Sequence, residues 1–397
     1  MKRVLVSVFV LMMALPLVAQ ETLEGEWTAK VKRTRLWMSI ELDWRNNDGR
    51  WGQTIRFREF EGIDHSIAAE ASEERTFYLR RDAGVIEFTG LFKNGRGIGD
   101  FVFTPNQTFK QELQRSGYED VDTKKLFTLT MHDVSRAFIK EMAEVGYSDL
   151  ALNRLIAMRI HGVDADFVRD MNAAGYKDIP SNKLVQLRIH GVSPEYVREL
   201  SDMGFDDLAL SKVVQFKIHG VSTEFAREMK ELGYASLDAS KLVQFRIHGV
   251  SPDFVREMKT AGFDDLSESK LVQFKIHGVS PEFVKDMHDL GFKDLSSSKL
   301  VQFRIHGVTP DFVAGMKKAG YDDLASNKLV QFKIHGVSPG FVEDFADLGY
   351  RNISPSDLVS MRIHGVTPSF AKDLKNKGLE NLTINKMIKM KIHNIYE

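Results

Sequence analysis

The sequence predicts a mainly α protein, an α-solenoid of helical hairpins preceded by a small antiparallel β domain. Three observations predict it. Ten histidines stand at a constant spacing of 29 residues from His132 to His393, and eight of them lie in the phrase (Arg/Lys)-Ile-His-Gly-Val. The residues before this region alternate between apolar and polar side chains instead. A fixed repeat of this length is typical of stacked supersecondary units, whereas alternation is typical of half-buried strands.

The first segment, residues 1–20, is predicted to be a signal peptide. Lys2 and Arg3 precede an apolar run from Val4 to Val18. That run is shorter than the roughly 20 residues that span a bilayer as a helix, so the mature chain is expected to be periplasmic or secreted, with no membrane span; an uncleaved anchor is the alternative. The chain has no cysteine, which excludes disulfides and thiolate chemistry.

The second segment, residues 21–104, is predicted to be a small antiparallel β domain. We expect about six strands, folded as a meander into a small sandwich or half-barrel. The clearest alternating runs are 37–42, 54–60, 76–80, 85–88 and 101–103. All four tryptophans lie between Trp27 and Trp51. They fit either the aromatic core of the sheet, which we favour, or a platform for carbohydrate or peptide.

The third segment, residues 105–397, is predicted to be the α-solenoid. Residues 105–118 match the second half of a repeat, and residues 385–393 match the first half of one. Nine complete hairpins are expected between these capping half-repeats. The residue before Ile-His alternates between Arg and Lys, which adds a second period of 58 residues.

One repeat illustrates the expected hairpin. Ser240 is predicted to cap a first helix over 241–248, and Gly249 to end it in the left-handed conformation. Ser251 and Pro252 then suit the N-cap and first position of a second helix. The apolar side chains of the first helix spread over about 200° with Ile247 among them, so neighbours should bury it on more than one side.

A polar strip remains on each first helix, and we predict that it forms the partner-binding face. The strip carries a lysine, a glutamine and, one turn after the glutamine, the histidine, as Lys241, Gln244 and His248 do. The glutamines and histidines are the predicted binding residues. They are Gln186, His190, Gln215, His219, Gln244, His248, Gln273, His277, Gln302, His306, Gln331 and His335. Each glutamine either forms a hydrogen bond between repeats or contacts a partner.

The histidines allow three interpretations. We favour a position in the last turn of the first helix, close to free carbonyls and the negative end of the helix dipole. A ligand-binding face is the second. Metal binding is the least favoured, because helices pack 8–10 Å apart whereas zinc requires each ligand nitrogen within about 2.1 Å. No metal or cofactor is therefore expected.

Motifs and charge limit the function. The chain lacks the signatures of metallopeptidases, serine hydrolases and nucleotide-binding loops, so no enzyme activity is predicted. A formal charge of −1 and a well-mixed surface argue against nucleic acid. The Ile-His-Gly-Val-Ser-Pro turn resembles a helix-hairpin-helix motif, but Ser251 stands where that motif has its second glycine. We expect a monomeric scaffold that binds protein or peptide, with glycan as the alternative partner.

Two further motifs carry a resemblance to a bacterial family. They are Arg-Arg-Asp-Ala-Gly at residues 80–84 and Gly-Ile-Gly-Asp-Phe-Val-Phe-Thr-Pro at residues 97–105. Together with the tandem hairpins they resemble bacterial exported proteins with Ile-His-Gly-Val repeats. Similar repeats occur next to membrane metallopeptidase domains of the β-lactam-sensor type. The resemblance implies a role in envelope sensing or docking, but it transfers no catalytic residue, because the peptidase domain is absent here.

Overall fold

The computed structural model describes residues 21–32, 37–44, 49–70, 73–379 and 382–395. The predicted signal peptide lies outside these residues. The chain divides into two compact units, residues 1–198 and 199–397, and the division falls within helix α8 (Pro194–Asp202). The first unit holds a β sheet and the first helices, and the second unit is helical throughout its described residues.

A single antiparallel sheet of seven strands forms the start of the first unit. The strands are β1 (Leu23–Val31), β2 (Trp37–Trp44), β3 (Arg50–Arg56), β4 (Phe60–Glu61), β5 (Arg75–Arg81), β6 (Gly84–Lys93) and β7 (Arg96–Pro105). A short 3-10 helix, Phe57–Glu59, precedes β4, and α1 (His65–Glu70) precedes β5.

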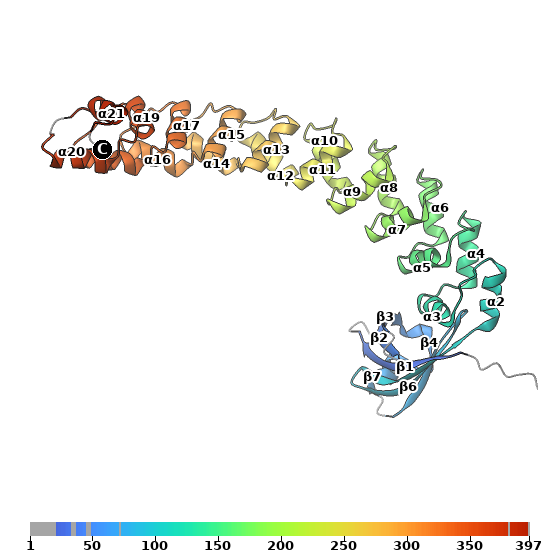
Figure 1. Cartoon of the computed structure of the whole chain (residues 1–397). Coiled ribbons are helices and arrows are strands. Elements are labelled where there is room, and N and C mark those ends of the chain that lie inside the picture. The colour runs from blue at the N-terminus through green and yellow to red at the C-terminus, as the bar shows by residue number, and fades with distance from the viewer. Residues whose placement is uncertain (1–20, 33–36, 45–48, 71–72, 380–381, 396–397) are drawn as a thin grey trace, which may run out of the picture. The chain divides into compact units, whose positions relative to one another are not determined.

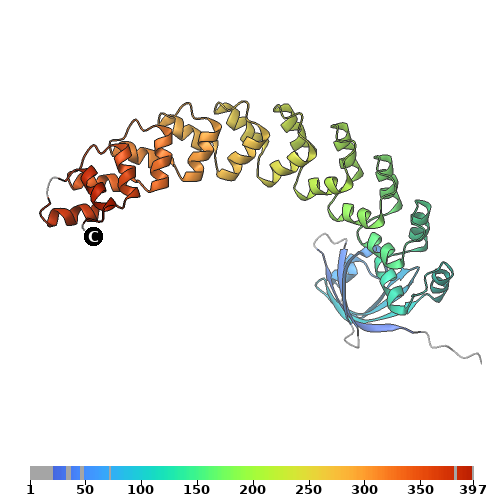
Figure 2. The ribbon, with the colours of Figure 1, turned by 45° about the horizontal axis from the view of Figure 1, so that its top comes forward.

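The strand order is β3-β2-β1-β7-β6-β5-β4, so two meanders join where β1 pairs with β7. The sheet curves into a half-barrel, which confirms that form of the prediction, while the sandwich alternative is wrong because no second sheet exists among the described residues. Figure 2 shows the curvature of the strands. The pairing of β1 with β7 joins residues about 70 apart in sequence, a contact that local alternation does not reveal.

Two glycines of β7 create the space for the centre of this sheet. A Cβ at Gly97 would lie 2.6 Å from the ring of Trp27, and a Cβ at Gly99 would lie 2.0 Å from the carbonyl oxygen of Thr89. Any side chain at either position would therefore collide with the sheet. Trp27 fills the space, is fully buried, and packs edge-on against Phe77 at 5.3 Å between ring centroids.

Twenty helices follow the sheet in the described residues, alternating in two series. The odd-numbered series is α3 (Thr123–His132), α5 (Leu152–Ile160), α7 (Ser181–Ile189), α9 (Leu210–Ile218), α11 (Ala239–Ile247), α13 (Glu268–His277), α15 (Ser297–His306), α17 (Ser326–His335), α19 (Pro355–Ile363) and α21 (Ile384–Ile392). The even-numbered series is α2 (Gln107–Arg115), α4 (Arg136–Glu144), α6 (Ala165–Ala173), α8, α10 (Thr223–Glu231), α12 (Pro252–Thr260), α14 (Pro281–Asp289), α16 (Pro310–Lys318), α18 (Pro339–Asp347) and α20 (Pro368–Asn376).

This order confirms the α-solenoid. Helices α3 to α20 make nine hairpins, with α2 and α21 as the two half-repeats in the described chain. Within the second unit, each odd-numbered helix packs against the next odd-numbered one, and α10 to α20 form the parallel row (Figure 1). The apolar side chains of both rows form the core, as Phe245 and Met258 show with no exposed surface.

The helix caps follow the sequence prediction with one exception. Ser251 Oγ accepts a hydrogen bond from Phe254 N at 3.2 Å and Pro252 is the first residue of α12, as predicted. Gly249 has a φ of 70°, in the left-handed region. The predicted N-cap Ser240 is wrong, because α11 begins earlier and Asp238 accepts the bond from Lys241 N at 2.8 Å.

Candidate functional site

The largest departure from the sequence prediction is a column of exposed isoleucines on the odd-numbered helices. The isoleucine before the histidine was expected to be buried, yet it is about half exposed in every odd-numbered helix from α5 to α21. In the second unit this isoleucine column consists of Ile218, Ile247, Ile276, Ile305, Ile334, Ile363 and Ile392, each between 49% and 55% exposed. In the first unit, Ile160 and Ile189 have similar exposures, 49% and 53%.

The geometry of α11 places this isoleucine beside the predicted polar strip. At 100° per residue, Ile247, Ser240, Gln244, His248 and Lys241 follow one another around an arc of about 120°. The isoleucine forms one edge of the arc and the lysine forms the other. Each odd-numbered helix from α9 to α17 repeats this sequence of side chains, with Asn327 in the place of Ser240 in α17. We call these five arcs the open face.

The glutamines of the strip do not make the hydrogen bond between repeats. Lysine makes it instead: Lys270 Nζ donates to Ser298 Oγ of the next odd-numbered helix at 3.0 Å. The same ammonium donates to Gln273 Oε1 within its own helix at 3.0 Å. The equivalent lysine–glutamine bond occurs in each repeat from Gln186 to Gln331. The side-chain carbonyl of each glutamine is therefore held by lysine, and the glutamines are half-buried or exposed.

The histidines end the odd-numbered helices, as the favoured interpretation expects. The carbonyl oxygen of His277 accepts a hydrogen bond at 3.3 Å from Arg304 Nε of the next repeat. The same arginine lies 5.0 Å from the ring centroid of Phe283, a cation–π contact. Lysine keeps that ring contact in the alternate repeats, as Lys333 does with Phe312 at 4.9 Å. The Arg/Lys position therefore ties each repeat to the one before it.

Metal binding finds no supporting geometry. No group of three or more His, Asp or Glu side chains in the described part of the chain is arranged to hold an ion. The five imidazoles of the open face are half-buried or exposed, and each belongs to a different helix. This arrangement suits a row of separate polar contacts.

The first odd-numbered helix, α3, differs because the β domain covers it. We call each odd-numbered helix a rung of the solenoid. Met131 stands where later repeats have the isoleucine, and its side chain has no exposed surface. Phe127 of the same helix packs edge-on against Trp44 and Trp51 of the half-barrel, at 5.8 and 6.0 Å between ring centroids. His132 lies 5.1 Å from the Trp51 ring. Burial, with the nearby charge of Arg81 as a smaller cause, lowers the pKa of the His132 imidazole from its usual value.

The tryptophan cluster is accordingly part of the protein interior and of this interface. Trp27 is fully buried in the sheet. Trp44 and Trp51 are partly exposed and contact α3. Trp37 lies under the guanidinium of Arg56 at 4.6 Å. These contacts fit the core interpretation for Trp27 and leave no cluster of four free indoles as a platform.

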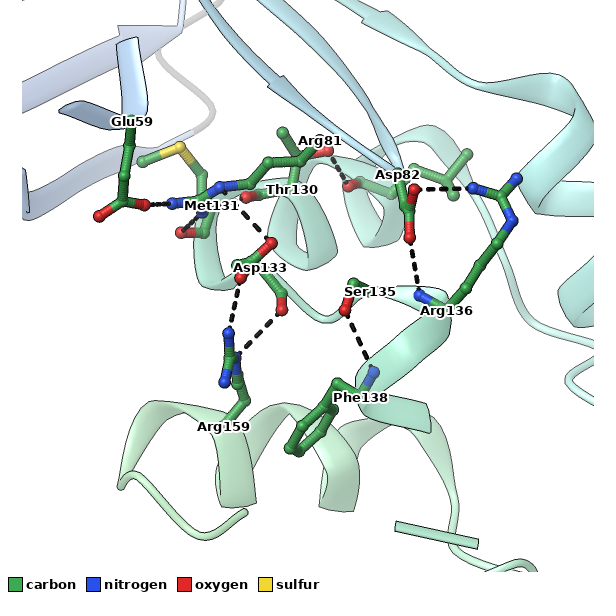
Figure 3. Close-up of polar contacts among 11 residues, drawn as sticks. Glu59, Arg81, Asp82, Thr130, Met131, Asp133, Ser135, Arg136, Phe138 and Arg159 are labelled. Carbon is green, nitrogen blue, oxygen red and sulfur yellow. Dashed lines mark hydrogen bonds and ion pairs between the residues drawn. The ribbon is translucent and has the colours of Figure 1, made fainter. Parts of the chain in front are cut away.

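The Arg-Arg-Asp-Ala-Gly segment fastens the half-barrel to the first hairpin (Figure 3). Arg81 donates to the carbonyl oxygens of Thr130 and Met131, in the last turn of α3, at 2.5 and 2.6 Å. Its guanidinium also pairs with Glu59 and lies 3.8 Å from Asp133. From the other side, Arg159 binds Asp133 at 2.6 Å.

The adjacent aspartate reaches the second helix of the same hairpin. Asp82 accepts a hydrogen bond from the backbone N of Arg136 at 2.8 Å, at the positive end of the α4 dipole. The Arg136 guanidinium pairs with Asp82 at 2.8 Å and with Glu112 at 2.6 Å. The end of β5 and the turn after it therefore contact both helices of the first hairpin. In the later hairpins, the preceding repeat makes such contacts.

The helices of the two rows in the second unit differ in charge. The odd-numbered helices α9 to α21 carry fourteen Lys and Arg residues but only Glu268 and Asp357 as acids. The even-numbered helices α10 to α20 carry nine basic and thirteen acidic residues. The near-zero charge of the whole chain therefore conceals a basic row and an acidic row.

The open face holds ten of the twelve predicted Gln and His residues, from Gln215 to His335, while Gln186 and His190 belong to α7 in the first unit. It also holds the lysines of the predicted polar strip and a column that sequence reasoning missed as functional, the isoleucines. The invariance of isoleucine across nine repeats was the available signal. None of the helices among the described residues is long and apolar enough to cross a membrane. No protein-family model matches the chain, and comparison with curated proteins finds no significant match.

Proposed function

We propose that the protein is a non-enzymatic extracytoplasmic scaffold that binds a protein or peptide along the open face. The isoleucine column carries this proposal. The same large apolar side chain is left about half exposed in successive repeats, and exposed apolar surface that recurs in this way is typical of interaction sites. The isoleucine recurs on every odd-numbered helix from α9 to α17, so weak contacts add along the face by multivalency.

Polypeptide fits the open face better than glycan does. Sugar rings are commonly recognised by stacking on exposed aromatic side chains. The large hydrophobic side chains that are well exposed in the described residues are isoleucines and one leucine, with no Trp, Tyr or Phe among them. Branched aliphatic side chains instead suit the apolar side chains of another polypeptide. Glycan remains the alternative, through the glutamine amides and imidazoles. The export part of the proposal depends on residues 1–20 of the sequence.

A site-specific crosslinking experiment tests the proposal. Benzoylphenylalanine replaces Ile276 on the open face or, as the control, Ala314, which is exposed on α16 of the other row. After irradiation in an envelope extract, we expect protease-sensitive adducts from the Ile276 position and far fewer from the Ala314 position. Equal adducts at both positions, or adducts at Ile276 that only glycan-degrading enzymes remove, would contradict the proposal.

A further inference from the structure

We infer that the occupant of the open face is an acidic polypeptide in the polyproline II conformation, with an apolar side chain at every third residue. The inference rests on the proposed function and names its partner class. Three features carry it: the charge of the odd-numbered row, the distance between rungs, and the order of side chains around each arc.

The charge of the row selects an acidic occupant. Each of the five arcs carries one lysine and no Asp or Glu, whereas the other Lys and Arg residues of α9 to α17 lie outside the arcs. The lysine column stands at the edge of each arc, and Lys270 is held there by Gln273 and Ser298. A second copy of the chain docking face to face would set these cations against one another. The even-numbered row is acidic but offers no well-exposed large apolar side chain among the described residues.

The distance between rungs selects the conformation. Neighbouring helices pack about 8–10 Å apart. A polyproline II helix rises about 3.1 Å per residue with three residues per turn, so one turn advances about 9.3 Å, close to one rung. An extended strand also covers about three residues per rung, but its side chains alternate between two faces. Successive rungs would then meet opposite faces of a strand, whereas polyproline II presents the same face at every rung.

The order of side chains around each arc selects the sequence pattern. In polyproline II, every third residue points in the same direction, so the side chains form three straight columns. These columns are about 120° apart around the helix axis. One column of apolar side chains can therefore lie along the isoleucines while a second, acidic column lies along the lysines. On α13 these edges are Ile276 and Lys270, with Gln273 and His277 between them. The Gln273 amide is then placed to donate to backbone carbonyls, which are all free in this conformation.

Synthetic peptides test the inference on the intact protein. The probe is a fluorescent peptide of five Leu-Glu-Pro triplets, one for each rung, measured by fluorescence anisotropy. The comparison peptides are five Leu-Lys-Pro triplets and a scrambled peptide with the composition of the probe but no three-residue period. We expect the probe to bind about tenfold or more tightly than either, and its affinity to fall as salt rises to about 0.5 M. Binding of either comparison peptide as tightly as the probe would overturn the inference.

Matched variants assign the binding to the two columns. The triple variant Ile247→Ser, Ile276→Ser and Ile305→Ser should weaken probe binding about tenfold or more, because each isoleucine has half its surface left to bury. Neutralising the arc lysines with Lys241→Gln, Lys270→Gln and Lys299→Gln should weaken it similarly. The control is a triple variant with the same change of charge on the even-numbered row.

This control variant carries Lys259→Gln, Lys285→Gln and Lys318→Gln, on helices α12, α14 and α16. Circular dichroism checks that all variants keep their helices. Unchanged binding in the isoleucine variant, or equal loss in the control, would overturn the inference. If the probe does not bind while Ile276 still gives protein adducts, the partner class is wrong and the proposed function stands. If the probe does not bind and Ile276 gives no protein adducts, the proposed function fails as well.

Discussion

Replacing Arg81 by alanine should detach the half-barrel from the first hairpin, whereas replacing its neighbour Arg80 should not. Only 9% of the Arg81 side chain is exposed, and its guanidinium binds two carbonyl oxygens at the end of α3 and the carboxylate of Glu59. Arg80 pairs with Glu61 at 2.7 Å, but the two side chains are 47% and 62% exposed.

The expected magnitudes follow from these surroundings. Removing one partner of a largely buried ion pair and leaving acceptors unsatisfied destabilises a protein by about 3 kcal/mol. An exposed pair such as that of Arg80 contributes about 0.5 kcal/mol, because solvent and salt screen it. Adding Glu59→Gln to Arg81→Ala should recover part of the loss, since the unpaired carboxylate is then removed.

Urea unfolding followed by tryptophan fluorescence measures the difference. Trp44 and Trp51 report on this interface because both rings contact Phe127 of α3. If Arg81→Ala and Arg80→Ala lower the free energy of unfolding equally, the half-barrel is not held by the Arg81 contacts. If Glu59→Gln recovers nothing in the double variant, the contact between Glu59 and Arg81 carries no part of the loss.

Three further predictions concern the repeats and the first rung. Asp238→Ala should lower stability by about 1 kcal/mol through loss of the α11 cap, while Ser240→Ala should change it little; equal urea midpoints would contradict the cap assignment. Gly278→Ala should lower stability by about 1–2 kcal/mol, because its φ of 68° is left-handed, and Gly278→Asn should lower it less; an alanine variant as stable as the parent would refute this. Because the pKa of His132 is lowered in the folded state, the unfolded chain takes up this proton first, so its contribution to stability is present above about pH 6.5 and is lost as pH falls below it. His132→Gln should therefore reduce the drop in melting temperature between about pH 7.5 and 5.5, and an unchanged drop would exclude this group.

The repeats could be predicted from sequence because their signals are local. Gly249 and Ser251 define the turn between two helices through φ preference and side-chain capping, and both act within a few residues. The half-repeats at the two ends followed from the same period. The sheet was harder, since the pairing of β1 with β7 depends on residues far apart in the chain. Its order and its closure into a half-barrel therefore needed the structure.

The exposed isoleucines could not be predicted from a helical wheel. A wheel assigns every apolar side chain to the core, but the surface that a neighbouring helix covers depends on packing. In α11, Leu242, Val243 and Phe245 fill the contacts with the adjacent helices, and Ile247 falls outside them. The arginine bridge is also tertiary, since Arg304 reaches the end of α13, about one period earlier in the chain. The sequence alone showed only that the residue before Ile-His alternates between Arg and Lys.

Helix α3 shows that the histidine and the isoleucine beside it are kept for different reasons. Helix α3 ends in Met131-His132-Asp133, where the odd-numbered helices α5 to α19 end in Ile-His-Gly, and Asp133 adopts the left-handed conformation with a φ of 53°. The helix therefore ends without isoleucine, so isoleucine is not required to terminate it. Histidine is kept at the covered rung and at the open ones, as expected of a residue with a place in the helix end. Isoleucine is absent from the one odd-numbered helix whose face the β domain buries and present on all the open ones, which ties it to the exposed surface and to whatever binds there.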